Sequence, residues 1–121
     1  MDFQLNEAAA KKARLIKTLY AIKMSVKISQ IGGARVGGFN ASWPFASLKV
    51  TGDQITLSVF SKKYEIEKGK INSIKRYRGL FSTGLKIEHS KNEMPEHLIF
   101  WTFSFNKLKQ ALEEIGYSVD A

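Results

Sequence analysis

The stretch ASLKVTGDQITLSV, residues 46–59, decides the fold class of this chain of 121 residues. Apolar and polar residues alternate from Ala46 to Thr51 and again from Ile55 to Val59, as they do in strands with one buried face. The Gly52-Asp53 pair between the two runs suits a tight turn. The stretch therefore predicts two antiparallel strands joined as a hairpin.

Further strands are predicted on the C-terminal side of this hairpin. Residues 63–67 and 85–88 alternate in the same way, and Lys68-Gly69-Lys70 suits a turn. Residues 73–78 carry charge on both faces, as an edge strand often does. The run LIFWTF, residues 98–103, is continuously apolar and indicates a strand that is covered on both faces.

Two helices are expected to flank the strands. Residues 6–23 begin with Asn6 as a good N-cap and carry a narrow apolar stripe at helical spacing, formed by Leu15, Leu19, Ile22 and Val26. The second helix has Ser104 as a plausible N-cap and ends at Gly116. Its apolar face is expected to pack over the sheet through Phe105, Leu108, Leu112 and Ile115.

The glycine pairs Gly32-Gly33 and Gly37-Gly38 are predicted to join two parts of the chain. Residues 1–32 are then an N-terminal helical appendage, and residues 33–121 form the main domain. The stretch GGARVGG, residues 32–38, lacks the Gly-Lys-Ser/Thr of a phosphate loop and the spacing of a dinucleotide loop. A flexible connection or a bulged strand is the preferred interpretation.

Composition narrows the function classes. The formal net charge is +8, which attracts nucleic acid, anionic lipid or acidic proteins alike. There are no cysteines, so disulfides and thiolate metal sites are excluded. No window approaches the ~20 apolar residues of a membrane span, and the N-terminus lacks the order of charges typical of a secretion signal. We expect a cytoplasmic protein, peripheral at most to the inner face of the membrane.

The order of elements resembles a family of small bacterial domains of the pleckstrin-homology (PH) and GRAM-like kind. The resemblance covers residues 35–117 and rests on core and turn positions: WPFASL at 43–48, GDQI at 52–55, GLKIEH at 84–89, IFW at 99–101 and IGY at 115–117. It implies a mainly β fold with α, a strongly bent antiparallel sheet or barrel of about seven strands capped by the C-terminal amphipathic helix. It also implies a domain that is not an enzyme. Many members bind phosphoinositides, and others bind peptides.

Catalytic and metal sites have weak support. His89 and His97 flank a loop with Glu88, Glu93 and Glu96, a set that could bind zinc if the two strands pair. His89 continues the inward parity of Leu85 and Ile87, however, and is more simply a residue at a strand end. Nothing suggests an activated nucleophile. We therefore expect no enzyme, no metal and no cofactor.

The candidate anion-binding residues are basic. Lys75, Arg76 and Arg78 interleave Tyr77, a composition that contacts phosphates and stacks on bases, although charge on an edge strand also prevents aggregation. Lys62, Lys63 and Lys86 are the further candidates, expected beside this cluster across neighbouring strands.

The expected function is a non-enzymatic interaction module of PH-like fold, which binds a protein partner or, weakly, the anionic cytoplasmic membrane surface. The alternative is a basic nucleic-acid-binding domain, although no recognised motif supports it. The stripe of Leu15, Leu19, Ile22 and Val26 needs cover from its own domain, a second copy or a membrane. A homo-oligomer formed through this helix is the preferred interpretation.

Overall fold

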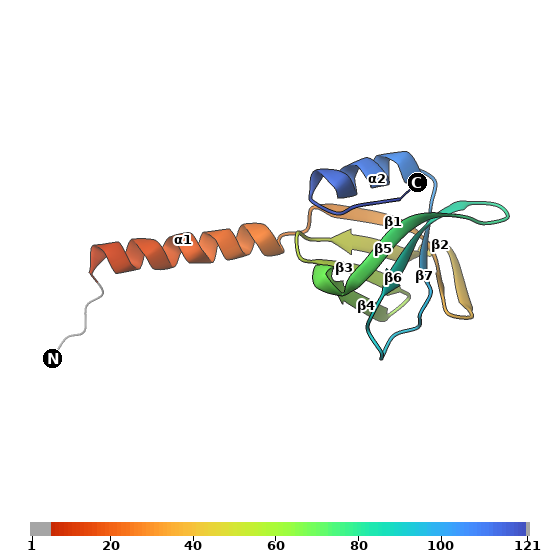
Figure 1. Cartoon of the computed structure of the whole chain (residues 1–121), viewed down its shortest axis with the longest axis horizontal. Coiled ribbons are helices and arrows are strands. Elements are labelled where there is room, and N and C mark those ends of the chain that lie inside the picture. The colour runs from red at the N-terminus through yellow and green to blue at the C-terminus, as the bar shows by residue number, and fades with distance from the viewer. Residues whose placement is uncertain (1–5, 121) are drawn as a thin grey trace.

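The computed structural model describes residues 6–120, and for residues 20–24 it describes the backbone alone. The elements follow in chain order: α1 (Glu7–Met24), β1 (Ile28–Val36), β2 (Phe39–Val50), β3 (Gln54–Val59), β4 (Lys62–Glu67), the 3₁₀ turn η1 (Lys68–Lys70), β5 (Ile71–Arg78), β6 (Thr83–His89), β7 (Leu98–Thr102) and α2 (Phe105–Glu114). Figure 1 shows α1 leading away from a β-rich body that α2 closes at one side. The fold class predicted from the sequence is confirmed.

The seven strands form one curled sheet in the order β4-β3-β2-β1-β7-β6-β5, in which every neighbouring pair is antiparallel. The hairpin predicted at residues 46–59 is β2–β3, with Ala46 opposite Val59 and Val50 opposite Ile55. Strand β5 is an edge strand, as its mixed charge predicted. The C-terminal tail lies along this edge, where the Arg76 N–H donates to the Asp120 carbonyl.

The core lies between the inner face of the sheet and α2. Leu48, Leu57, Leu85, Ile87 and Phe100 are fully buried there, and α2 adds the buried side chains Phe105, Leu108 and Leu112 with Ile115 partly buried. The alternation in the sequence correctly predicts the inward positions of Leu48, Leu57, Leu85 and Ile87, because side chains alternate between the two faces of a strand.

The ends of the two helices follow from local chemistry. Asn6 caps α1, since its side-chain oxygen accepts from the Ala9 N–H at 2.7 Å. Gly116 ends α2 with a φ of +99°, and the N–H of Tyr117 reaches back to the Leu112 carbonyl in a Schellman arrangement. Ser104 stands at the N-cap position of α2 without a side-chain capping bond. Its hydroxyl instead accepts from the Gln30 amide at 3.3 Å.

Residues 32–38, which the sequence suggested as a join between two parts of the chain, lie in β1 and in the turn that follows it. Strand β1 begins at Ile28, so Gly32 and Gly33 lie inside it, at a register shift where residues 42–45 of β2 bulge away. A Cβ on Gly32 would collide with the Trp101 carbonyl oxygen, and one on Gly33 would lie 2.7 Å from the Ala41 carbonyl oxygen. Glycine is needed for these close approaches of backbone. The bulged-strand interpretation applies, and the boundary drawn between residues 32 and 33 falls within β1.

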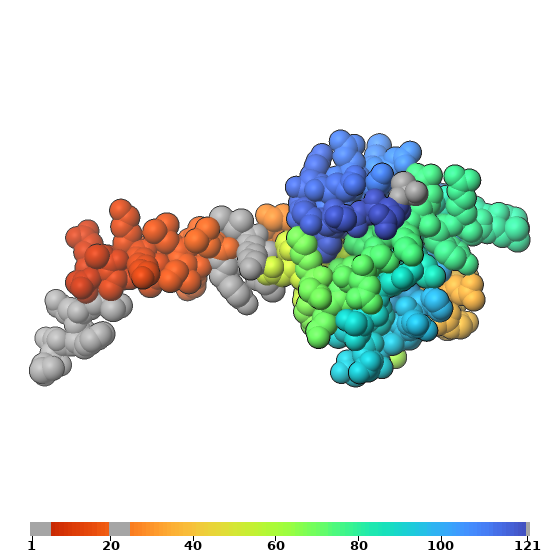
Figure 2. Space-filling model, in the orientation of Figure 1, coloured from red at the N-terminus to blue at the C-terminus, as the bar shows by residue number. Residues whose placement is uncertain are grey.

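Helix α1 contributes no side chain to the core among the described residues. In Figure 2 it extends from the body as a separate arm. The apolar stripe is exposed where it is described, with exposed fractions of 56% at Leu15, 64% at Leu19 and 54% at Val26. The side chain of Ile22 lies outside the described part of the chain.

Candidate functional site

Trp101 lies on the outer face of the sheet over a floor of glycines. Its neighbours across β1 and β6 are Gly33 and Gly84. A Cβ on Gly84 would lie 2.9 Å from the indole, and one on Gly79, in the β5–β6 turn, would lie 2.8 Å from it. The indole Nε1 donates to the Asn40 side-chain oxygen at 3.1 Å. The missing side chains therefore make room for the ring, and the hydrogen bond fixes its orientation.

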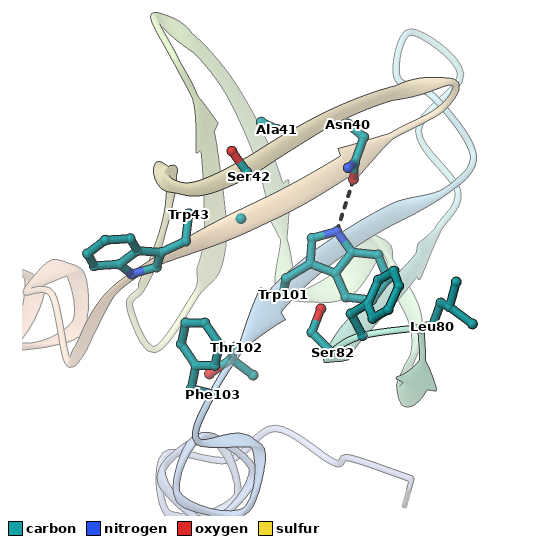
Figure 3. A pocket seen from close by; sticks show the side chains of 12 residues that line it. Asn40, Ala41, Ser42, Trp43, Leu80, Ser82, Trp101, Thr102 and Phe103 are labelled. Carbon is teal, nitrogen blue, oxygen red and sulfur yellow. Dashed lines mark hydrogen bonds between the residues drawn. The ribbon is translucent and has the colours of Figure 1, made fainter.

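A cleft of about 450 Å³ opens beside Trp101. It is lined by Gly33, residues 40–43 of β2, residues 79–82 of the β5–β6 turn and residues 101–103 at the end of β7. Figure 3 shows Trp43 and Phe103 on one side of this cleft and Leu80 on the other, with Trp101 between them. None of the residues that line it is charged. We call this feature the Trp101 cleft.

The rim of the cleft exposes large apolar side chains to solvent. The exposed fraction is 90% at Leu80 and 94% at Phe81, both in the β5–β6 turn, and 87% at Phe103. Trp43 is also more than half exposed. The β5–β6 turn projects from the end of the molecule opposite α1 (Figure 1). Exposed apolar patches are typical of surfaces that contact protein or membrane.

A second aromatic cluster forms at other turns. Phe60, between β3 and β4, stacks on Phe45 at 5.3 Å between ring centroids and meets the edge of Phe39 at 6.0 Å. Phe60 has a left-handed φ of +55°, which is rare for a bulky residue. Its N–H donates to the Phe45 carbonyl at 2.9 Å, which helps to hold that conformation. All three rings remain about half exposed.

The structure divides the basic cluster of β5 between two faces, because successive side chains on a strand point in opposite directions. Lys75 faces outward opposite Lys86 and forms an ion pair with Glu88 at 3.3 Å. That hydrogen-bonded contact lowers the pKa of the Glu88 carboxyl below its usual range. Arg76 instead lies over the Phe105 ring and donates to the Asn106 side chain. Arg78 is exposed at the end of β5, next to the apolar turn.

Lys62 and Lys63 are not neighbours of this cluster in the sheet. They begin β4, which forms the edge of the sheet opposite β5, so all the other strands lie between β4 and β5. Lys62 lies over the Tyr64 ring at 5.4 Å. Lys86 is a true cross-strand neighbour of Lys75, as expected, and lies 5.9 Å from the centre of the Tyr77 ring.

The two histidines occupy separate environments. His89 Nε2 lies 2.7 Å from the Pro95 carbonyl oxygen, and its Nδ1 accepts from the Lys91 N–H, so both ring nitrogens are engaged within the loop. His97 is exposed, and its backbone carbonyl accepts from the Gly37 N–H. Within residues 6–120, no group of three or more histidine or acidic side chains is placed to hold a metal ion.

Sequence reasoning missed the Trp101 cleft. The sequence pattern assigns no role to residues 79–82, and it places Phe103 at the end of a strand covered on both faces. Two signals were available: the adjacent pair Leu80-Phe81 between a glycine and a serine, and the repeated placement of glycine in strands that flank Trp101. Only the register of the sheet shows that these glycines meet one indole.

Comparison with models of known protein families gives no match, and no curated protein matches the sequence. In the part of the chain that the structure describes, no helix is both long and apolar enough to cross a membrane.

Proposed function

We propose that this chain is a non-enzymatic, PH-like interaction module that docks on an anionic membrane surface through the β5–β6 turn. The observation that carries the proposal is the exposure of Leu80 and Phe81, at 90% and 94%, on a projecting turn with Arg78 beside it. An apolar tip enters the boundary between headgroups and acyl chains, while basic residues remain at the anionic headgroups.

The free energy of binding expected from these residues suits reversible attachment to a membrane. Full burial of a leucine or phenylalanine side chain contributes roughly 1.5–3 kcal/mol, and each basic residue near an anionic leaflet adds about 1 kcal/mol. Two inserted side chains together with Arg78 therefore give weak to moderate binding, because immobilising the protein on the surface opposes it. Trp43 and Phe103 at the rim suit the interfacial region, where aromatic rings are enriched.

The test is sedimentation with vesicles of phosphatidylcholine, with and without phosphatidylserine. We expect binding to the anionic vesicles, and we expect Leu80→Ser with Phe81→Ser to weaken it at least tenfold. Ile31→Ser is the control, because Ile31 is an exposed apolar residue on β1 outside the cleft. Its effect should stay below twofold.

Tryptophan fluorescence gives an independent measurement. The chain has two tryptophans, Trp43 and Trp101, and both line the cleft. Docking through the turn should shift their emission to shorter wavelength, and Trp43→Phe isolates the contribution of Trp101. The proposal would be contradicted if Leu80→Ser with Phe81→Ser bound as tightly as the control Ile31→Ser. It would also be contradicted if the protein bound neither kind of vesicle.

A further inference from the structure

The strand register places two parallel rows of side chains on the outer face of the sheet. In the first row Trp101 stands between Gly33 and Gly84, and Tyr77 follows beyond Gly84 on β5. The Trp101 and Tyr77 rings lie 5.7 Å apart between centroids. This row presents two neighbouring aromatic rings on a platform of glycines.

The second row is basic and lies two residues further along each strand. Arg35 on β1 and Lys86 on β6 flank Ile99 on β7, and Lys75 on β5 follows Lys86. Two residues along a strand span ~7 Å, and neighbouring strands lie ~4.8 Å apart. Arg35 and Lys86 are therefore diagonal neighbours of Trp101, about 9 Å from it between backbone positions.

Two hollows connect the rows. One, of about 380 Å³, touches Trp101, Tyr77, Asn40 and Arg35, and the other, of about 170 Å³, is lined in part by Arg35, Tyr77, Lys86 and His97. They share Arg35 and Tyr77, and no acidic residue lines either of them. The nearby carboxylate of Glu88 is paired with Lys75, so Arg35 and Lys86 supply the positive charge here.

We infer that this outer face binds single-stranded nucleic acid, with bases against Trp101 and Tyr77 and phosphates on Arg35 and Lys86. Stacking on aromatic side chains together with a basic track is the usual basis of such binding, and it tolerates many sequences. A duplex keeps its bases stacked on each other and cannot offer their faces to these rings. The hollow of about 380 Å³ reaches Leu80 of the β5–β6 turn, so the two proposed surfaces meet at Trp101. Arg35 and Lys86 do not line the Trp101 cleft, so their variants test the nucleic-acid inference apart from membrane docking.

The test is fluorescence anisotropy with a labelled oligothymidylate and an oligouridylate of about ten nucleotides, a length within the usual site size of such proteins. We expect binding of both at low salt, with at least tenfold weaker binding of the matching duplex. Arg35→Ala with Lys86→Ala should weaken binding at least tenfold. It should also reduce the slope of log affinity against log salt by about 1.4, which is 0.7 for each lost phosphate contact.

The matched control is Lys62→Ala with Lys63→Ala, which removes the same charge from the opposite edge of the sheet. It should weaken binding less than threefold. Tyr77→Ala should weaken binding about tenfold with the salt slope unchanged, since it removes stacking and no charge. The inference would be overturned if the two double variants had equal effects or if the duplex bound as tightly as the single strand. It would also be overturned if neither oligonucleotide bound. Urea unfolding of each variant establishes that it is folded.

Discussion

The two faces of the strands β1, β7 and β6 use apolar residues in different ways. On the inner face Leu85, Ile87 and Phe100 are fully buried beneath α2. On the outer face Trp101 is only partly buried, and the neighbouring turn leaves Leu80 and Phe81 in solvent. Burial on the inner face stabilises the fold, whereas exposed apolar surface contributes nothing to it and favours association. The difference separates a face whose apolar residues stabilise the fold from a face whose exposed apolar residues we propose to bind a partner.

Leu112→Ala should give the largest loss of stability. Leu112 on α2 is fully buried, and removing such a side chain leaves a cavity that costs about 2–5 kcal/mol. Leu80→Ala is the matched control, because Leu80 is 90% exposed and its truncation should change the free energy of unfolding by less than about 0.5 kcal/mol. Urea denaturation measures both. Equal losses would show that the turn packs in solution and would remove the contrast between the faces.

Gly84→Ala should lower the free energy of unfolding by about 1–3 kcal/mol, as overpacking does. The new Cβ would lie 2.5 Å from Cγ2 of Ile99 and 2.9 Å from the Trp101 ring, so both side chains would have to shift. Gly38→Ala is the control, since nothing lies within 4 Å of its added Cβ. We also expect the fluorescence of Trp101 to change in Gly84→Ala. Unchanged stability and fluorescence would show that the indole does not rest on Gly84.

The Tyr117 hydroxyl should make the free energy of unfolding fall at alkaline pH. Burial, with the charge of Asp53, raises the pKa of Tyr117 to about 12, while its value in the unfolded chain is about 10. The neutral phenol is therefore favoured in the folded state. Its contribution is complete below pH ~10 and is lost as pH rises from 10 towards 12, because only the unfolded chain then releases the proton.

Tyr117→Phe separates this effect from other titrations. The hydroxyl donates to the Thr51 carbonyl at 2.8 Å, so its loss should cost about 1–2 kcal/mol at neutral pH. The difference in the free energy of unfolding between Tyr117→Phe and the native chain should shrink above pH 10. A difference that stays constant up to pH 12 would mean that the phenol is not held in its neutral form.

The sequence allowed the inner face to be predicted because its pattern is local. Alternation in residues 46–51 and 55–59 identified the β2–β3 hairpin, and the helical spacing of Leu108 and Leu112 identified the buried side of α2. The sequence predicts a main domain that starts at Gly33, because Gly32 and Gly33 suggest a break, whereas β1 begins at Ile28. Glycine is required there because the backbone of Trp101, which is distant in the chain, and that of Ala41 on the next strand approach closely.

The outer face could not be predicted in the same way, since it depends on which strands become neighbours. Trp101 meets Gly33 and Gly84 only because β7 lies between β1 and β6. The basic residues show the same limit. Lys75 and Lys86 were expected to be neighbours and are, whereas Lys62 and Lys63 lie at the other edge of the sheet.

Removal of α1 should have the smallest effect on stability and still change association. Helix α1 adds no described side chain to the core, so a chain that begins at Ser25 should unfold within about 0.5 kcal/mol of the full chain. A cut at Gly33 would not test this, because it would remove part of β1. An isolated helix of this length is marginal in water, and the exposed Leu15 and Leu19 need a cover. We expect the cover to be a second copy of α1.

Light scattering distinguishes these outcomes. The full chain should have the mass of an oligomer, and the chain without α1 should be monomeric. Leu15→Ser with Leu19→Ser should dissociate the oligomer, whereas Ala13→Ser, about 160° around the helix from Leu15, should not. The lysines of α1 oppose association between copies, so the mass should rise with salt as their repulsion is screened. A monomeric mass for the full chain at high concentration and high salt would exclude the oligomer and leave the stripe of α1 for another partner.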